Sequence, residues 1–295
     1  MGLNFRKSIS LGKGLKLNLN KKSAGLSFGI KGARYSVNTN GDRRATFSIP
    51  GTGISYTKTF GDKKERGGKN DRAKKKELEK NQEVVQEYNE QVDEIIGIHR
   101  AGVDAIDWNR VETIPRKLAS LQTRVLEGDI DAYYEVIEKA EPFNELVDFG
   151  SEFEIGTDNP KCIVAEFNIK EEDVIPDTMV TLTESGKVSE KKMTKTAYYE
   201  MLQDYVCSVM IRMARDLFAL LPVERVIIHA VDDALNTATG NTEEVTYVSV
   251  IFDRETFNKI NLDAIDPSDS LSNFEYNMKF AKTTGFKPVV KLTDW

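Results

Sequence analysis

Three residues in the C-terminal half have side chains that could carry out metal-dependent hydrolysis. Residues 165–170 read AEFNIK within a strand-like stretch, and Asp158 precedes them. Two carboxylates can hold Mg²⁺, and a lysine beside them can orient the attacking water. Asp158, Glu166 and Lys170 are therefore the candidate catalytic residues.

The elements predicted around these residues form an acidic α+β domain over residues 148–295. Strands are predicted at 149–155, 161–169, 179–183, 225–231 and 244–252, and a long core helix at 196–221. This order resembles restriction-nuclease-like domains, in which an acidic residue on one strand precedes a Glu/Asp-x-Lys motif on the next. Lys170 stands two residues too late for that motif, so a nuclease is the alternative hypothesis.

The remaining side chains that could take part in catalysis or bind a metal are histidines, cysteines and aspartates, and each has a structural explanation. His229 lies inside an apolar strand, and His99 continues a heptad seam. Cys162 and Cys207 lie in apolar runs, which is typical of buried free thiols. A Cys–His pair is conceivable, but no flanking motif accompanies it. Asp266 fits the N-cap of a helix, which explains an aspartate cluster without a metal. We predict no metal and no cofactor.

Positive charge is concentrated at the N-terminal end. The 295-residue chain has a net charge of −6, but residues 1–76 hold 19 Lys and Arg against 4 Asp and Glu, a net charge of +15. The remaining residues hold 22 against 43, a net charge of −21. Such asymmetry indicates an acidic partner for this end, which could also be the protein's own acidic part. The candidate binding residues are Lys16, Arg34, Arg43, Arg44, Lys63 and Lys64.

Residues 1–60 are predicted to form a small β module. Apolar and polar residues alternate in short runs from residue 9 to 57, the pattern of strands with one apolar face. Asn40-Gly41 and Pro50-Gly51 suit turns between five or six antiparallel strands. The module has no helix to cover the apolar face. The sheet must therefore roll into a barrel, pair with another copy or pack on the rest of the chain.

Four motifs in this module resemble the bacterial domain of unknown function family 4236. They read FRKSI at 5–9, LNLNK at 17–21, GARYSV at 32–37 and PGTGISYT at 50–57. The resemblance covers about the first 60 residues. It implies a small N-terminal β module and no particular activity.

A charged linker at 61–77 precedes a helical spacer at 78–147. Apolar and seam residues recur with a seven-residue period, at Leu78, Asn81, Val85, Tyr88, Val92 and Ile95. About three heptads can form a coiled coil, or the first arm of a helical hairpin whose second arm lies at 114–140. The hairpin is slightly favoured, with its turn near Trp108.

These patterns together predict a cytoplasmic protein, because no segment has the apolar length of a membrane span or of a signal peptide. We expect a non-enzymatic interaction or assembly protein that forms a homo-oligomer or binds a protein partner. Its basic β module would contact an acidic partner. Nucleic acid is a further candidate and a membrane is not. The alternative is a metal-dependent, nuclease-like C-terminal domain acting on nucleic acid held by the basic module.

Overall fold

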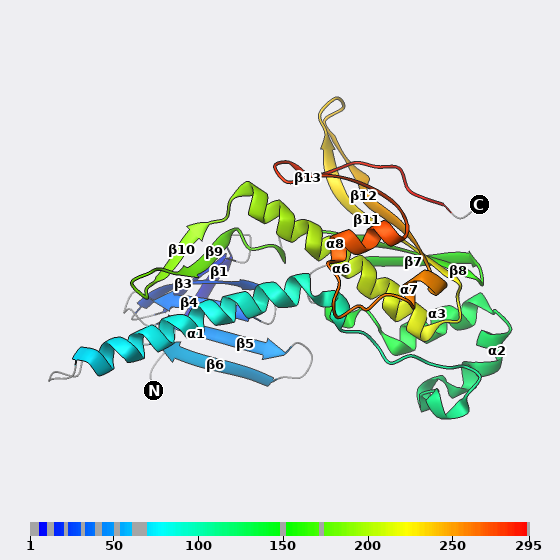
Figure 1. Ribbon diagram of the computed structural model, residues 1–295, viewed down its shortest axis with the longest axis horizontal. Coiled ribbons are helices and arrows are strands. Elements are labelled where there is room, and N and C mark those ends of the chain that lie inside the picture. Colours follow the sequence, from blue (N-terminus) through cyan, green and yellow to red (C-terminus); the bar gives the residue numbers. More distant parts are fainter. Residues whose placement is uncertain are drawn as a thin grey trace. The chain divides into compact units, whose positions relative to one another are not determined.

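The computed structural model describes residues 6–10, 15–20, 23–30, 33–38, 43–49, 54–60, 70–147, 152–170 and 174–293. Within residues 1–74 it describes the side chains of Ser36, Arg44, Ala45 and Lys58. The chain forms two compact units. The first contains the six N-terminal strands, the following helix as far as Gln91 and a hairpin within 172–192, and the second contains the other described elements. Helices and strands are mixed (Figure 1), which confirms the α+β class.

The first unit begins with a six-stranded antiparallel meander, which confirms the predicted strands. They are β1 (Arg6–Ser10), β2 (Leu15–Asn20), β3 (Ser23–Ile30), β4 (Ala33–Asn38), β5 (Arg43–Ile49) and β6 (Ile54–Phe60). Each pairs with the next in sequence, so β1 and β6 are the edge strands. The predicted turns at Asn40-Gly41 and Pro50-Gly51 lie outside the described residues.

Cross-strand register gives this sheet two chemically different faces. Residues that pair directly across an antiparallel sheet share a face, and successive residues alternate between faces. One row across all six strands reads Ser10, Lys16, Ser27, Ser36, Arg44 and Thr59. A row on the other face reads Leu15, Phe28, Tyr35, Ala45 and Lys58. Arg44 is exposed and its neighbour Ala45 is 6% exposed, so the polar face is open at this point and the apolar face is covered.

The long helix α1 (Asn70–Ile96) contacts two elements of its own unit. Lys58, on the apolar face, forms an ion pair with Glu83 of α1. The side-chain amide of Asn81 donates to the Gly186 carbonyl at 2.7 Å, in the turn between β9 (Thr178–Leu182) and β10 (Val188–Lys192). At Lys58 the apolar face therefore packs on the rest of the chain, the third of the predicted outcomes. Part of the heptad seam also contacts a hairpin of the same chain.

The spacer is helical, as predicted, but its second arm is divided. After η1 (Ile98–Arg100) come η2 (Val111–Thr113), η3 (Arg116–Leu121), α2 (Gln122–Leu126), α3 (Ile130–Ala140) and α4 (Asn144–Val147). Gly128 adopts a φ of +78°, which ends α2, and the Asp129 carboxylate accepts the N–H groups of Asp131 and Ala132 to begin α3. His99 lies in η1, beyond the end of α1, so it does not continue the helical seam.

The second unit is built on a mixed six-stranded sheet. Its order is β14 (Gly285–Lys287), β13 (Glu275–Ala281), β12 (Asn241–Asp253), β11 (Arg225–Asn236), β8 (Cys162–Asn168) and β7 (Phe153–Asn159). β8 and β11 are parallel, and the other neighbours are antiparallel. The chain returns from β8 to the parallel strand β11 through the long helix α6 (Lys195–Leu220).

Helix α6 is the centre of the core and confirms the predicted helix at 196–221. The Thr194 hydroxyl caps its first turn, and Pro222 follows its end. One face of the sheet is buried together with it, at Ile163, Ala165, Phe167, Val226, Ile228, Ala230, Val248, Val250 and Phe252. Full burial of such a side chain stabilises a fold by about 1.5–3 kcal/mol. Both cysteines are buried thiols outside any disulfide, as predicted.

The C-terminal segment crosses the opposite face of this sheet. We call residues 288–293 the strap. Its backbone N–H groups at Val289 and Leu292 donate to the Thr246 carbonyl (2.8 Å) and to the Ser249 Oγ (2.9 Å). The Lys291 ammonium binds the Glu166 carboxylate on β8. The second sheet is therefore covered by α6 on one face and partly by the strap on the other.

Several boundaries differ from the sequence prediction. β7 begins at Phe153 rather than 149, and most of the polar stretch between the strands predicted at 225–231 and 244–252 is a paired ribbon. The sequence analysis also gave no strand at β10, β13 or β14. The helices α7 (Arg254–Phe257) and α8 (Pro267–Ser270) are short, and Asp266 caps α8 as predicted. Within the described residues, no helix combines the length and apolar character needed to cross a membrane.

Candidate functional site

Three of the predicted binding residues lie on the polar face of the N-terminal sheet. Lys16 and Arg44 occupy the same cross-strand row, with Ser27 and Ser36 between them. Arg34 is two residues from Ser36 on β4, so it shares their face. Neighbouring strands lie about 4.8 Å apart, which places Lys16 and Arg44 about 14 Å apart across the sheet. We call the face that carries Lys16, Arg34 and Arg44 the basic face.

The other three predicted binding residues are not placed on the basic face by the described structure. Arg43 pairs with Phe60 and alternates with Arg44, so it lies on the apolar side of the sheet. Lys63 and Lys64 lie outside the described residues. The sequence suggested a single group because Arg43 and Arg44 are adjacent, whereas adjacent strand residues point to opposite faces.

Small hydroxyl and amide residues separate the cations of the basic face. The positions on it are Ser8, Ser10, Asn18, Asn20, Ser23, Ser27, Ser36, Asn38, Thr46, Ser48, Ser55, Thr57 and Thr59. Short polar side chains let a partner approach the sheet closely. A guanidinium can then bind a carboxylate or phosphate through two hydrogen bonds.

The candidate catalytic residues are spread along the β7–β8 hairpin. Glu154 pairs directly with Glu166, and Asp158 lies four residues further along β7, about 13 Å from that pair. Lys170 follows β8 in a left-handed backbone conformation, φ +43°, and its ammonium binds Glu152 at 2.6 Å. The structure therefore does not bring Asp158, Glu166 and Lys170 together. The nuclease hypothesis stays a prediction.

Glu166 instead belongs to a polar group beneath the strap. Its two carboxylate oxygens accept from the Lys291 ammonium at 2.8 and 2.7 Å. His229, its register partner on β11, is 3% exposed and its Nδ1 lies 2.9 Å from the Ser249 Oγ. Burial lowers the pKa of His229 to about 4; Lys291 also lowers it and Glu166 opposes the change. The ring is neutral at physiological pH, and the carboxylate is already neutralised by a lysine.

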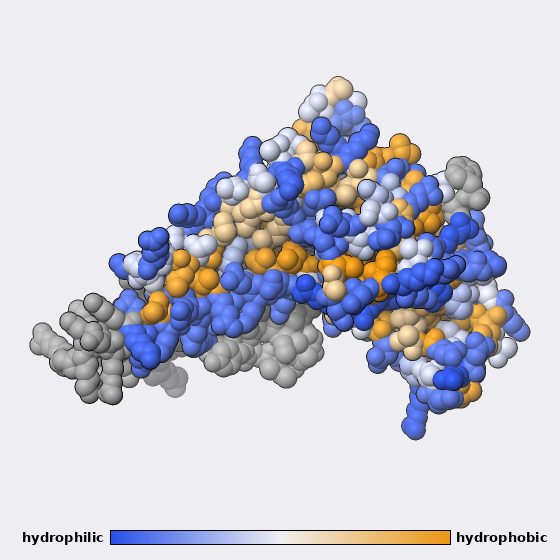
Figure 2. Space-filling model, in the orientation of Figure 1, coloured by the Kyte–Doolittle hydropathy of each residue, from blue (hydrophilic) through white to orange (hydrophobic). Residues whose placement is uncertain are grey.

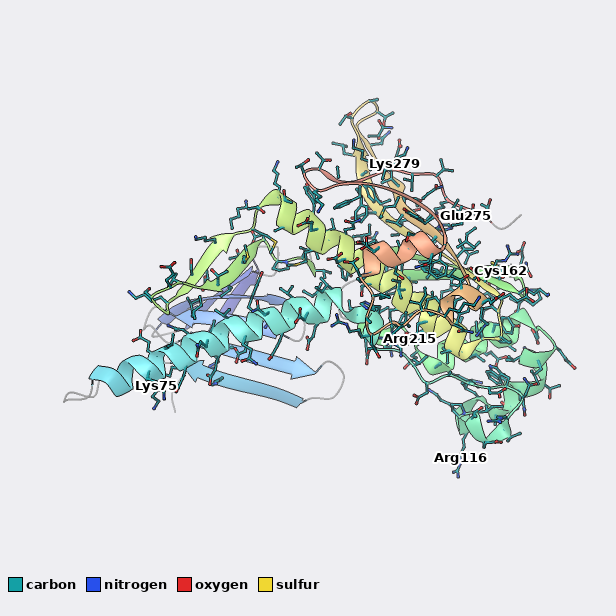
Figure 3. All side chains as sticks on the ribbon, in the orientation of Figure 1. Lys75, Arg116, Cys162, Arg215, Glu275 and Lys279 are labelled. Carbon is teal, nitrogen blue, oxygen red and sulfur yellow. The ribbon has the colours of Figure 1, made fainter. Side chains whose placement is uncertain are left out.

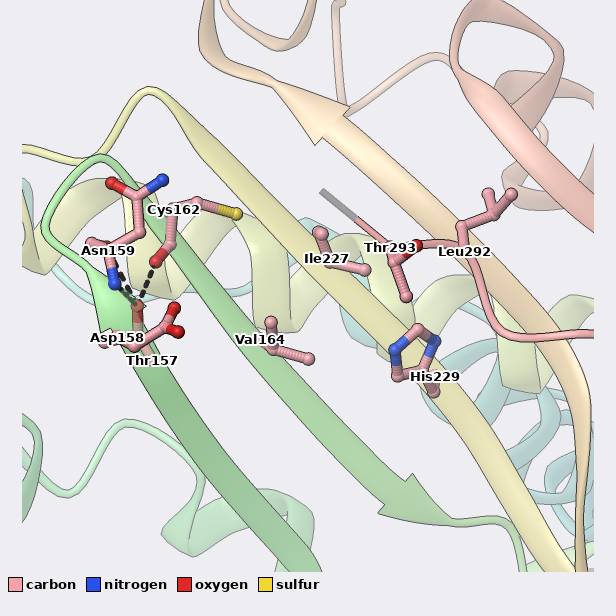
Figure 4. A pocket seen from close by; sticks show the side chains of 9 residues that line it. All are labelled: Thr157, Asp158, Asn159, Cys162, Val164, Ile227, His229, Leu292 and Thr293. Carbon is pink, nitrogen blue, oxygen red and sulfur yellow. Dashed lines mark hydrogen bonds between the residues drawn. The ribbon is translucent and has the colours of Figure 1, made fainter. Parts of the chain in front are cut away.

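A small hollow of about 220 Å³ opens beside this group. Figure 4 shows Asp158 and Asn159 at one end, His229 at the other and the apolar side chains of Val164 and Ile227 between them. Cys162 lines the same hollow but pairs with Arg225, four residues before His229 on β11. The structure therefore does not form the conceivable Cys162–His229 pair.

A buried ion pair lies on α6. Asp216 is fully buried, and its carboxylate accepts from the Arg212 guanidinium at 2.6 Å and from the Val103 N–H at 2.9 Å. Burial raises the pKa of the Asp216 carboxyl, and Arg212 opposes that change. Arg215 (Figure 3), which directly precedes Asp216, donates to the carbonyls of residues 99–101. Arg215 and Asp216 therefore fasten the segment after α1 to the core helix, while Arg212 also contacts Glu145 of α4.

A carboxylate group lies where α6 meets α8. Burial raises the pKa of Asp204 to about 6, and Asp266, Glu200 and Asp269 add to the increase. Asp266 itself is occupied as the cap of α8. Among the described residues, no group of three His, Cys, Asp or Glu side chains is arranged to hold a metal ion.

The sequence did not predict the residues that bind Glu166 and His229. Lys291 lies 125 residues from Glu166, and Ser249 lies 20 residues from His229. No local motif marks either contact. The only available signal was the position of His229 in a strand of apolar residues, which indicates a buried imidazole.

Comparison with known proteins reaches only the first unit. Residues 3–57 match a family described as Protein of unknown function (DUF4236). The match confirms the resemblance seen in the sequence motifs. The matched segment spans β1 to β5 and more than half of β6, so it includes Lys16, Arg34 and Arg44. No curated protein and no solved structure matches the chain significantly.

Proposed function

We propose that this protein is a non-enzymatic interaction protein whose basic face binds an acidic partner. The observation that carries the proposal is the separation of the two faces of the DUF4236 sheet. Exposed Arg44 and buried Ala45 are neighbours in sequence and lie on opposite faces.

The apolar face already has a partner within the chain. The ion pair between Lys58 and Glu83 holds α1 against it, and the Lys58 ammonium also acts on the pKa of Glu87, one helical turn further on. The Glu87 side chain is half-buried. Burial raises its pKa and outweighs the opposite effect of Lys58. On β5, the strand next to Lys58, the polar row includes exposed Arg44. The face left for a partner is the basic one.

The polar groups of the second unit support a structural role more than a catalytic one. Glu166 is bound by Lys291, and His229 is bound by Ser249. A metal ion at Glu166 would have to displace the lysine before it could activate a water.

The proposal is tested by measuring how the full chain binds acidic probes. The probes are a labelled polyglutamate peptide and a labelled mixed-sequence oligonucleotide, followed by fluorescence anisotropy at low and high salt. We expect salt-sensitive binding to at least one probe. Replacing Lys16, Arg34 and Arg44 by Gln should weaken it on the order of 100-fold, at about 1 kcal/mol for each cation.

The matched control replaces Lys75, Lys76 and Lys80, three exposed lysines of α1, by Gln. This variant loses the same charge within the same unit and should bind within a few-fold of the natural protein. An equal loss in both variants would show that total charge and not the basic face governs binding. Mg²⁺-dependent cleavage of the oligonucleotide that disappears in Glu166→Ala would favour the nuclease instead.

A further inference from the structure

The hairpin between β11 and β12 continues beyond the sheet as a two-stranded ribbon. β8 pairs with β11 only as far as Val231, and β13 pairs with β12 only from Val248. A register shift between Ala230 and Val231 lies at the base of this extension, and such bulges increase the twist of a strand. Figure 1 shows the ribbon projecting from the sheet. An isolated two-stranded ribbon is marginally stable in water, so its projection needs an explanation.

The ribbon has acidic side chains and no basic residue. Residues 232–246 read DDALNTATGNTEEVT, and we call them the acidic ribbon. Asp233 and Glu244 are direct cross-strand partners and both are exposed. Like charges opposite each other destabilise a sheet. The nearest cation to Glu244, Lys291, is 3.7 Å away and is bound more closely to Glu166.

The ribbon also exposes one large apolar side chain near its tip. Leu235 is 64% exposed, next to the acidic pair along β11. In Figure 2 the projecting end shows hydrophilic residues beside a small hydrophobic patch. Carboxylates around an exposed leucine are suited to a basic surface that also offers short side chains for close approach.

We propose that the acidic ribbon of one copy docks on the basic face of a second copy. The proposal rests on the function proposed above and names its acidic partner. The Asp233–Glu244 pair would lie between Lys16 and Arg44, at the register positions of Ser27 and Ser36. Two different surfaces meet in this contact, so it is heterologous: the copies join head to tail into a ring or an open chain.

The first test is the mass of the full chain in solution, measured by light scattering over a concentration series at low and high salt. At low salt and high concentration we expect a weight-average mass of at least double the chain's 33.2 kDa. High salt should return it to the monomer, because exposed ion pairs are screened. A monomer at every concentration at low salt would overturn the proposal.

Charge reversal on each surface tests the contact itself. The ribbon variant is Asp233→Lys with Glu244→Lys, and the face variant is Arg34→Glu with Arg44→Glu. Each variant alone should remain a monomer. An equimolar mixture should regain self-association, because the natural face of one variant meets the natural ribbon of the other and the two reversed surfaces also have opposite charges. The control, Glu112→Lys with Glu127→Lys, changes two exposed glutamates of the same unit and should assemble like the natural protein.

The outcomes separate this inference from the proposed function. If the face variant loses binding to the acidic probes while the ribbon variant leaves self-association unchanged, the basic face has another partner and the inference is wrong. Oligonucleotide binding without self-association would assign the face to nucleic acid and would also overturn it. Circular dichroism of each variant verifies folding, and the ribbon variant should fold like the natural protein because it exchanges one exposed like-charge pair for another.

Discussion

The two sheets of this protein bury their faces differently. In the N-terminal sheet, strict alternation gives one apolar face, which contacts α1, and one polar face, which is open at Arg44. In the C-terminal sheet, both faces of β11 from Val226 to Val231 are buried, by α6 on one side and partly by the strap on the other. At β5 the first sheet therefore has one exposed and one covered face, whereas the second sheet buries both faces of its central strand.

The largest effect should come from the buried ion pair of the second unit. We expect Asp216→Ala to destabilise this unit by about 3–5 kcal/mol, because it leaves the Arg212 guanidinium, 5% exposed, without its main partner. Chemical denaturation followed by tryptophan fluorescence measures the loss, since Trp108 is buried against α6 and donates to the Leu220 carbonyl. A loss under 1 kcal/mol would mean that the α6 core tolerates a charge there.

The stability of the second unit should fall in acid because of His229. The folded-state pKa of about 4 lies below the ordinary value of 6.5. The unfolded chain therefore takes up a proton first, and stability is lost as the pH falls from about 6.5 to about 4. A shift of this size corresponds to roughly 3 kcal/mol. His229→Gln should flatten this part of the curve of unfolding free energy against pH, and an unchanged slope would exclude His229 as its source.

Substitution by Glu should destabilise the first unit strongly at one residue of β5 and hardly at all at its neighbour. We expect Ala45→Glu to destabilise the first unit by about 2–3 kcal/mol, because it places a charge on the covered face. Arg44→Glu, on the open face, should change stability by less than about 0.5 kcal/mol. Thermal unfolding of the two variants measures the difference. Equal losses would contradict the separation of the faces.

The smallest expected effect is a gain in stability when Asp204 is replaced by a neutral residue. Its folded-state pKa of about 6 is above the ordinary value of 3.8, so its ionisation costs stability as the pH rises from about 4 to about 6. Asp204→Asn should stabilise the protein at pH 7 by about 1–2 kcal/mol, a value reduced for the partial exposure of the carboxyl. The gain should vanish near pH 4. A gain that persists there would have another origin.

The difference between the sheets also explains how much the sequence could predict. The alternating runs of β2 to β6 and the apolar stripe of α6 each follow a period that a local pattern reveals. Most of the ribbon, residues 232–243, was not predicted as strand because both of its sides are polar, so no alternation marks it. The strap contacts were not predictable, because Lys291 meets Glu166 only once the sheet has formed. Arg43 was grouped with Arg44 because the two charges are adjacent in sequence. The alternation of side chains along a strand, which places them on opposite faces, was not applied to this pair.

The most direct test of the account is the reactivity of single cysteines on the two faces of β5. Cys162 and Cys207 are buried in the natural protein and provide a slow reference. The account predicts that Arg44→Cys reacts with a maleimide on the order of 100-fold faster than Ala45→Cys, and that an acidic probe slows only the first reaction. Similar rates at both positions, or protection of Ala45→Cys instead, would contradict the central claim that the open basic face binds the partner.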